Sequence, residues 1–209
     1  IFDQNRALIS RLERRVVMKR VEKGASFPKY HDTFFWLSDS MIANECFNCS
    51  DPNVGLSLNE DRTYVKCYMG DTGLLISHAF DERGIVSADL YRKLMFGKLE
   101  VNEGMLVENI VAQMLRAAGH KLYFFSNSSR TSAEDRMEID FLIAKPVTTS
   151  RHNISPIGVK SGQRYTLNSL RKCISKYGSQ LSTPYVLHDK DVKIEDGIAY
   201  LPLYMTPLL

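Results

Sequence analysis

Acidic residues and a lysine on neighbouring apolar runs form the strongest chemical pattern in this sequence. Asp140 lies in the run MEIDFLIA, and Lys160 lies in the following run, ISPIGVKSG. Because side chains alternate along a strand, Glu138 and Asp140 share one face, and Gly158 and Lys160 share a face of the next strand. If the two strands pair, Asp140, Gly158 and Lys160 lie side by side at one edge of a sheet.

Such a set suits metal-dependent hydrolysis of a phosphodiester. Carboxylates hold Mg²⁺, the metal activates water, and a lysine stabilises the developing charge. Glu108 joins the set because it falls at the margin of the apolar face of a predicted helix, where a charge without a partner is costly. We therefore predict Glu108, Asp140 and Lys160 as catalytic residues, and Asp140, Glu108 and Glu138 as ligands of a Mg²⁺ ion.

Gly158 stands where a second acid would complete this site. Glu138, which shares its face with Asp140, is the nearest candidate to replace that acid. Taken singly, Asp140 is better explained as a strand-end acid that faces water. Lys160 is explained simply as the solvated end of a strand that leads into a turn. The sequence therefore leaves three interpretations open: an active site, a site that has lost one ligand, and a β-hairpin that carries a lysine.

The N-terminal segment 4–23 combines basic side chains with a helical period. Leu8, Leu12 and Val16 are spaced by four residues, which predicts a helix. A phosphate-contacting surface and a solvated helix face both explain its charge. The predicted nucleic-acid contacts are Arg11, Arg14, Arg15, Lys19 and Arg20.

The composition of the 209-residue chain is that of an ordinary globular protein, with 44% hydrophobic and 24% charged residues. A formal net charge of +3 permits a nucleic-acid partner without requiring one. Four cysteines without a secretory leader indicate a reducing compartment, so the predicted location is cytoplasmic. No apolar run approaches the roughly 18 residues of a membrane-spanning helix, and no membrane partner is predicted.

Two features invite other chemistry. The run CFNC, with Cys46 and Cys49, has the spacing of half a zinc site, but no second half follows, so two loop cysteines without a special role are favoured. Trp36 lies among apolar residues and is predicted to pack in the core or between domains rather than to stack on bases.

Residues 1–80 predict a winged-helix-like unit. A second helix, within 24–42, begins after Ser26 as N-cap with a proline in its first turn. A loop or hairpin tip at 44–61, a strand at 62–69 and a short helix at 70–80 follow. The apolar face of the second helix is predicted from Tyr30, Phe34, Leu37 and Met41, and Asp71 or Thr72 would cap the short helix.

Residues 81–103 are predicted to connect this unit to a second domain at 104–209. A helix ends at Gly119, strand-like runs follow at 120–129, 137–146 and 154–162, and a helix follows at 166–178. Two further strand-like runs lie at 183–189 and 197–205. This order predicts an α/β sandwich of the α+β class with a mixed sheet.

The order of these motifs resembles one protein family. GMLVENIVAQML, EIDFLI and PIGVKSG are similar to the nuclease-like domain of the PD-(D/E)XK superfamily at the C-terminus of a prokaryotic AAA-type ATPase family, and YMGDTGLL resembles the winged-helix segment of that family. The resemblance implies a restriction-endonuclease-like domain with Glu108, Asp140 and Lys160 in the nuclease site. The family carries an acid where this chain has Gly158.

The resemblance also implies a P-loop ATPase domain before Ile1, which would be a partner of this chain. The chain itself contains no G-x-x-x-x-G-K-[ST], so we expect ATP to bind only in that upstream domain.

Three functions remain in competition. The chain is a nucleic-acid-binding module, with DNA favoured, whose nuclease-like site is degenerate; or a Mg²⁺-dependent DNA nuclease; or a protein-interaction or oligomerisation element of the ATPase. Gly158 favours the first and third functions over the second. The basic N-terminal segment favours the first over the third, so we expect a binding module and leave enzymatic activity open.

Overall fold

The computed structural model describes residues 16, 22–53, 55–80, 103–129, 132–145, 153–162 and 164–209. The chain divides into two compact units, of which the first comprises Ile1–Glu45 and Lys66–Gln113, and the second Cys46–Val65 and Met114–Leu209. The predicted nucleic-acid contacts on the N-terminal helix, Arg11, Arg14, Arg15, Lys19 and Arg20, lie outside the described residues, as does the connecting segment up to residue 102.

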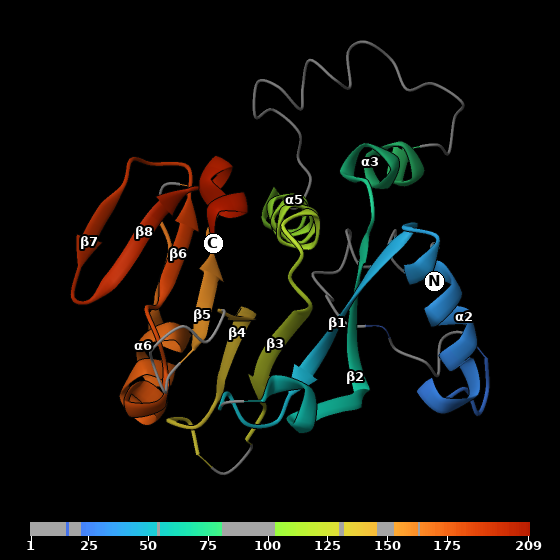
Figure 1. Cartoon of the computed structure of the whole chain (residues 1–209), viewed down its shortest axis with the longest axis horizontal. Helices are drawn as coiled ribbons and strands as arrows, with labels where there is room; N and C mark the ends of the chain where they lie inside the picture. The colour runs from blue at the N-terminus through green and yellow to red at the C-terminus, as the bar shows by residue number, and fades with distance from the viewer. Residues whose placement is uncertain are drawn as a thin grey trace. The chain divides into compact units, whose positions relative to one another are not determined.

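An eight-stranded mixed sheet forms the framework, with the strand order β2-β1-β3-β4-β5-β6-β8-β7 (Figure 1). The pairs β3–β4, β4–β5 and β7–β8 are antiparallel, and β1–β3, β5–β6 and β6–β8 are parallel. The predicted α+β class with a mixed sheet is confirmed. The strands are β1 (Ala43–Cys49), β2 (Glu60–Met69), β3 (Leu122–Asn127), β4 (Met137–Ala144), β5 (Ile154–Val159), β6 (Tyr185–His188), β7 (Lys193–Glu195) and β8 (Ile198–Pro202).

The α-helices follow the predicted periods, and short 3₁₀ segments join or follow other elements. The order of helix, three strands, helix and strand that the sequence predicted after residue 103 is confirmed. The helices are α2 (Phe27–Asp39), α3 (Thr72–Phe80), α5 (Glu103–Ala117) and α6 (Asn168–Tyr177), and the 3₁₀ segments are η2 (Leu56–Asn59), η4 (Gly178–Gln180) and η5 (Leu203–Leu208).

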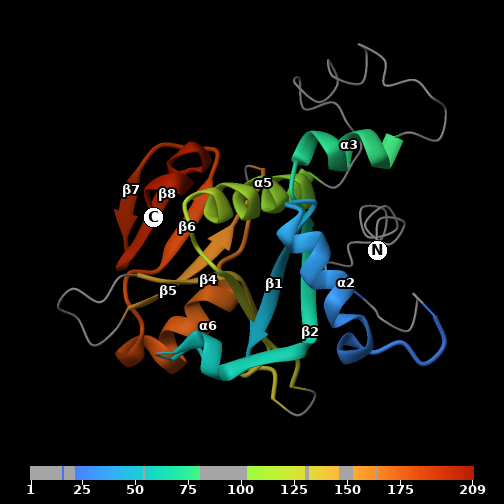
Figure 2. The ribbon, with the colours of Figure 1, turned by 45° about the vertical axis from the view of Figure 1, so that its right-hand side comes forward.

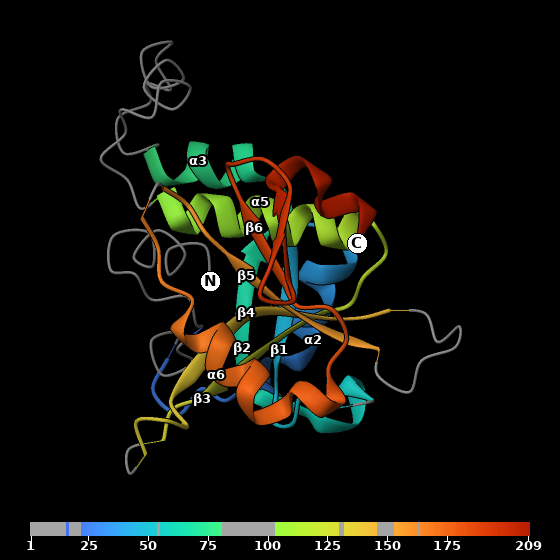
Figure 3. The same cartoon turned by 90° about the vertical axis from the view of Figure 1, so that its left-hand side faces the viewer.

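In the second unit, α6 packs on β4 and β5 (Figures 2 and 3). Leu170 and Cys173 are its buried residues. Tyr177 adds an edge-to-face contact with the ring of Phe125, at 5.6 Å between centroids. β4 and β5 are mostly buried.

In the first unit, α2 begins where the sequence predicted, but its buried face differs in part from the predicted apolar face. Ser26 takes an extended backbone conformation before the helix, and Phe34 and Leu37 are buried. Met41 was predicted on the same face, but α2 ends at Asp39, and Met41 is 83% exposed with a φ of 57°. The prediction that Trp36 packs in the core is wrong, because its side chain is 60% exposed.

The predicted loop at 44–61 is wrong at its beginning, because β1 occupies Ala43–Cys49 and is largely buried. β1 pairs in parallel with β3, with Cys46 opposite Leu122 and Asn48 opposite Phe124. Asparagine disfavours strands locally. In β1 the Asn48 side chain accepts a hydrogen bond from the Ser126 amide at 2.9 Å. β1 and β2 are thus strands of the eight-stranded sheet.

Candidate functional site

The candidate residues lie where β4 and β5 separate. Paired residues run from Ala144 opposite Ile154 to Phe141 opposite Ile157, so Asp140 and Gly158 are the next residues beyond the paired stretch. There the Asp140 carboxylate accepts a hydrogen bond from the Val159 amide at 2.8 Å. A side chain therefore satisfies a strand amide at the point where the backbone partner is lost.

A pocket of about 110 Å³ opens at this point, and we call it the β4–α6 pocket. Its walls come from β4, from β5 and the loop after it, and from the first turn of α6. The structure thereby brings together Glu138, Asp140, Gly158 and Lys160, as their alternation in the sequence predicted. The lining residues are Glu138, Ile139, Asp140, Gly158, Lys160, Thr166, Leu167, Asn168, Ser169 and Leu170.

Asp140 and Lys160 form a loose ion pair in this pocket. Their Oδ2 and Nζ atoms are 3.8 Å apart, and the Asp140 side chain is 8% exposed while that of Lys160 is 25% exposed. The Lys160 amide donates to the Leu187 carbonyl at 2.8 Å, which ties the lysine backbone to β6. The carboxylate is therefore held by β5, and the ammonium group keeps contact with solvent.

The backbone at Gly158 does not require glycine. A Cβ at this position would lie 3.7 Å from the Lys160 Cε atom and 4.0 Å from the Leu170 Cδ2 atom, which is ordinary van der Waals contact. A Cβ therefore fits at this position without a steric conflict.

The first turn of α6 contributes positive potential to the pocket. The N-cap residue is Leu167, whose apolar side chain cannot accept a hydrogen bond from the exposed amides of that turn. Amides at a helix N-terminus carry a partial positive charge and favour a nearby anion. The pocket therefore combines carboxylates on its β4 wall with the Lys160 ammonium and a helix N-terminus on the facing side.

Glu108 does not line the β4–α6 pocket. It lies in α5, is 2% exposed, and its Oε1 atom is 3.2 Å from the Lys66 Nζ atom and accepts a hydrogen bond from the Tyr68 hydroxyl at 2.5 Å. The sequence predicted that a carboxylate here needs a partner. That partner is Lys66 of β2, which sequence reasoning missed. A lysine inside an apolar strand was the signal that could have found it.

Two further residues that the sequence analysis did not single out, Asn109 and Gln113, bind the beginning of the run DTGLL to α5. The Asn109 side chain accepts from the Met69 amide at 2.9 Å and donates to the Thr72 hydroxyl at 2.9 Å. Thr72 also donates to the Gln113 side chain, at 3.0 Å from its hydroxyl. The Asp71 carboxylate accepts from the Leu74 amide at 2.7 Å, so Asp71 is the cap of α3. The run thus has a structural role in joining β2, α3 and α5.

The cysteines are buried, and burial disfavours the thiolate form of three of them. Cys46 and Cys49 are buried in β1, so the prediction of two loop cysteines is wrong in its placement. Burial raises the pKa of the Cys49 thiol to about 11, and those of Cys67 and Cys173 to about 12. Within the described part of the chain, no group of three or more His, Cys, Asp or Glu residues is arranged to hold a metal ion.

Comparison with known families gives two matches. Residues 103–205 match a domain of unknown function, DUF4143, and residues 5–83 match another domain of unknown function, DUF8612. Neither a curated protein nor a solved structure matches the chain. Of the helices that the structure describes, none is long and apolar enough to cross a membrane.

Proposed function

We propose that this chain is a nucleic-acid-binding module of an AAA-type ATPase, with DNA as the favoured partner, and that its nuclease-like pocket has lost one acidic ligand. The observation that carries the proposal is the meeting of Asp140, Lys160 and Gly158 in one pocket. Asp140 and Lys160 have the charged groups that a phosphodiester site needs. Gly158 has no side chain that could bind a metal ion. The resemblance of EIDFLI and PIGVKSG to a PD-(D/E)XK domain supports the same conclusion.

The missing acid weakens the case for catalysis more than the case for binding. Hydrolysis assisted by Mg²⁺ needs ligands that fix the ion beside the phosphate. Gly158 supplies none, although its surroundings leave room for a side chain. Phosphate binding needs only positive potential, which the partly exposed Lys160 ammonium and the N-terminus of α6 supply.

The test is the salt dependence of DNA binding, measured by fluorescence anisotropy of a labelled duplex over a range of KCl concentrations. We expect the logarithm of the association constant to fall linearly with log[salt], with a slope of about 0.9 for each neutralised phosphate. Lys160→Met removes one such contact, so it should weaken binding and reduce the slope by about 0.9.

Lys193→Met is the matched control. Lys193 belongs to the same unit and pairs with Glu195 on β7, but it does not line the pocket, so its removal should leave the slope nearly unchanged. Absence of DNA binding, or binding that is insensitive to salt, would contradict the proposal. It would favour a protein-interaction role, for which the exposed Phe35 and Trp36 on α2 are the candidate surface.

A Mg²⁺-dependent nuclease is the second candidate, and the position of Glu138 favours it. Glu138 lines the same pocket as Asp140. One or two carboxylates suffice for Mg²⁺ when water and substrate oxygens complete the shell, so the donor chemistry fits the ion. Glu138 and Asp140 would hold it, and the ion would supply screening of the phosphate charge and an activated water.

A cleavage assay on single- and double-stranded DNA with Mg²⁺ or Mn²⁺ separates the two candidates. For a binding module we expect no cleavage by the chain as it stands. Gly158→Glu restores the acid where a Cβ makes only ordinary contacts, and it is the variant in which we expect cleavage to appear. Gly158→Gln, of equal size without the charge, is the control and should stay inactive.

Metal-dependent cleavage by the unmodified chain that disappears in both Asp140→Asn and Glu138→Gln would instead establish the nuclease. In that case Glu138 would be the replacement for the missing acid.

A further inference from the structure

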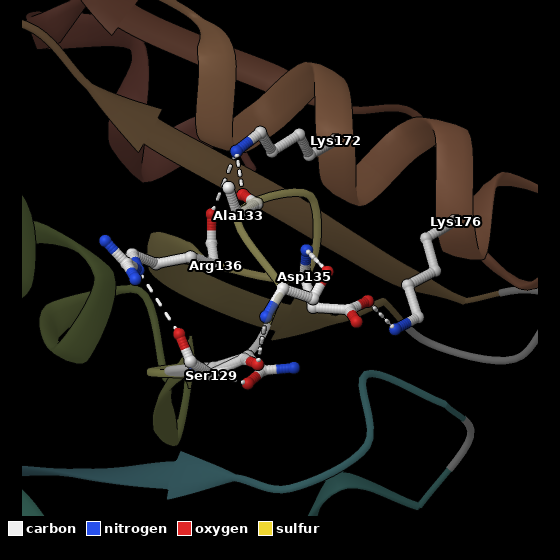
Figure 4. Close-up of polar contacts among 8 residues, drawn as sticks. Ser129, Ala133, Asp135, Arg136, Lys172 and Lys176 are labelled. Carbon is white, nitrogen blue, oxygen red and sulfur yellow. Dashed lines mark hydrogen bonds and ion pairs between the residues drawn. The ribbon is translucent and has the colours of Figure 1, made fainter.

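Lys172 of α6 forms hydrogen bonds to the backbone just before β4 (Figure 4). The Lys172 Nζ atom donates to the Ala133 carbonyl at 2.6 Å and to the Arg136 carbonyl at 3.2 Å. Arg136 immediately precedes Met137, the first residue of β4. The ammonium group therefore fixes the backbone at the point where the strand begins.

Hydrogen bonds also connect the residues of this loop that the structure describes. The Ser132 amide donates to the Ser129 hydroxyl at 3.1 Å, and the Asp135 amide donates to the Ser132 hydroxyl at 3.2 Å. The Arg136 side chain returns to the Ser129 carbonyl at 3.3 Å. These contacts connect the start of β4 to the residues just after β3.

This part of β4 is the wall of the β4–α6 pocket that carries Glu138 and Asp140. It is paired with β3 on one side, from Asn127 opposite Met137 onward. On the other side, pairing with β5 begins only at Phe141. Lys172 therefore connects the start of β4 to α6. The first turn of α6 lines the same pocket.

Lys176, one helical turn further along α6, makes a contact of a different kind. Its Nζ atom is 2.5 Å from the Asp135 carboxylate, but both side chains are substantially exposed, at 44% and 39%. Exposed ion pairs of this type contribute little to stability. The two Lys172 hydrogen bonds are exposed as well, but they are made to backbone carbonyls, which are fixed to the chain and cannot move aside as a carboxylate side chain can.

We infer that Lys172 is a positioning residue, which sets the separation of the β4 and α6 walls of the pocket. It acts through the backbone of the loop and takes no part in ligand contact. The position of Asp140 against Val159 is a direct product of this arrangement. The expected effect of Lys172 on nucleic-acid binding rests on the proposed function, whereas its role in positioning the pocket wall does not.

Amide hydrogen exchange in the whole chain tests the inference without a ligand. The Val159 amide reports the pocket, because its hydrogen bond is to the Asp140 side chain. In Lys172→Met we expect this amide to exchange about tenfold faster, because opening at the wall needs less free energy, while amides in the β6–β8 pairs keep their rates. Lys176→Met is the matched control and should leave the Val159 rate unchanged.

Lys172→Arg, which keeps donors able to reach two carbonyls, should restore the slow rate. Faster exchange throughout the sheet together with a lower melting temperature in Lys172→Met would show a general stabilising role and overturn the inference. An unchanged Val159 rate, or equal effects of Lys172→Met and Lys176→Met, would overturn it as well.

DNA binding gives the second readout. Because the Lys172 charge is used by carbonyls, Lys172→Met should weaken binding without changing the salt slope, whereas Lys160→Met changes both. If the unmodified chain binds no nucleic acid, the proposed function fails, and the exchange measurement still decides whether Lys172 positions the wall.

Discussion

Glu108 is half of a buried pair of opposite charges. A carboxylate that is 2% exposed in α5 and an ammonium that is fully buried in β2 lie 3.2 Å apart, and a tyrosine hydroxyl adds a hydrogen bond. Neither charge would be tolerated alone at such a depth. The pair gives Glu108 a structural explanation that does not involve the β4–α6 pocket, and its predicted role as metal ligand and catalytic residue stays a prediction.

The stability of Glu108→Gln distinguishes these roles. This change removes the carboxylate that Lys66 pairs with, so we expect the free energy of unfolding to fall by about 3–5 kcal/mol. Urea denaturation followed by circular dichroism measures it in the absence of metal. A residue whose only role is to bind metal would show almost no loss under these conditions.

The double variant Lys66→Met with Glu108→Gln supplies the control. Because it removes both charges, it should recover much of the stability lost in the single variant, since a neutral pair avoids the desolvation cost of a lone ion. A double variant that is less stable than Glu108→Gln alone would refute the pairing.

Among the elements, those with a clear period were predictable. α5 and α6 repeat apolar residues at helical spacing, and β4 and β5 are short apolar runs bounded by polar loops. β1 has neither property, since its sequence ANECFNC alternates imperfectly and carries asparagines. It forms a strand because it pairs in parallel with β3, and because the Asn48 side chain accepts a hydrogen bond from the Ser126 amide.

The start of α3 depends on one local contact that can be tested. The Asp71 carboxylate accepts from the Leu74 amide, and a Cβ at Gly73 would lie 3.0 Å from that carboxylate oxygen. We expect Asp71→Ala to lower the free energy of unfolding by about 1 kcal/mol, as for other N-cap losses, and Asp71→Asn to cost much less because asparagine also caps. Chemical denaturation measures both, and equal losses in the two variants would exclude the capping role.

For the whole molecule, the arrangement of strands was beyond what local patterns determine. The order β2-β1-β3-β4-β5-β6-β8-β7 places strands from the beginning and the end of the chain in one sheet. β7 comprises only Lys193–Glu195, and all three residues are exposed. It has no alternation of buried and exposed residues, and the sequence did not predict it. The winged-helix and restriction-endonuclease-like assignments stay predictions, while the mixed sheet of an α+β fold is established.

The sequence by itself determined which residues of β4 and β5 share a face, because alternation is a property of the extended chain. Alternation placed Glu138 with Asp140 and Gly158 with Lys160, and the pairing of β4 with β5 in the structure brought the two sets together. The tertiary structure alone decided that Lys66 neutralises Glu108, a contact between residues 42 positions apart, and that Lys172 grips the loop before β4. It also left Trp36 exposed. Such contacts depend on how segments that are distant in the sequence pack together. A local sequence pattern therefore does not predict which residue will neutralise a buried charge or cover an apolar side chain.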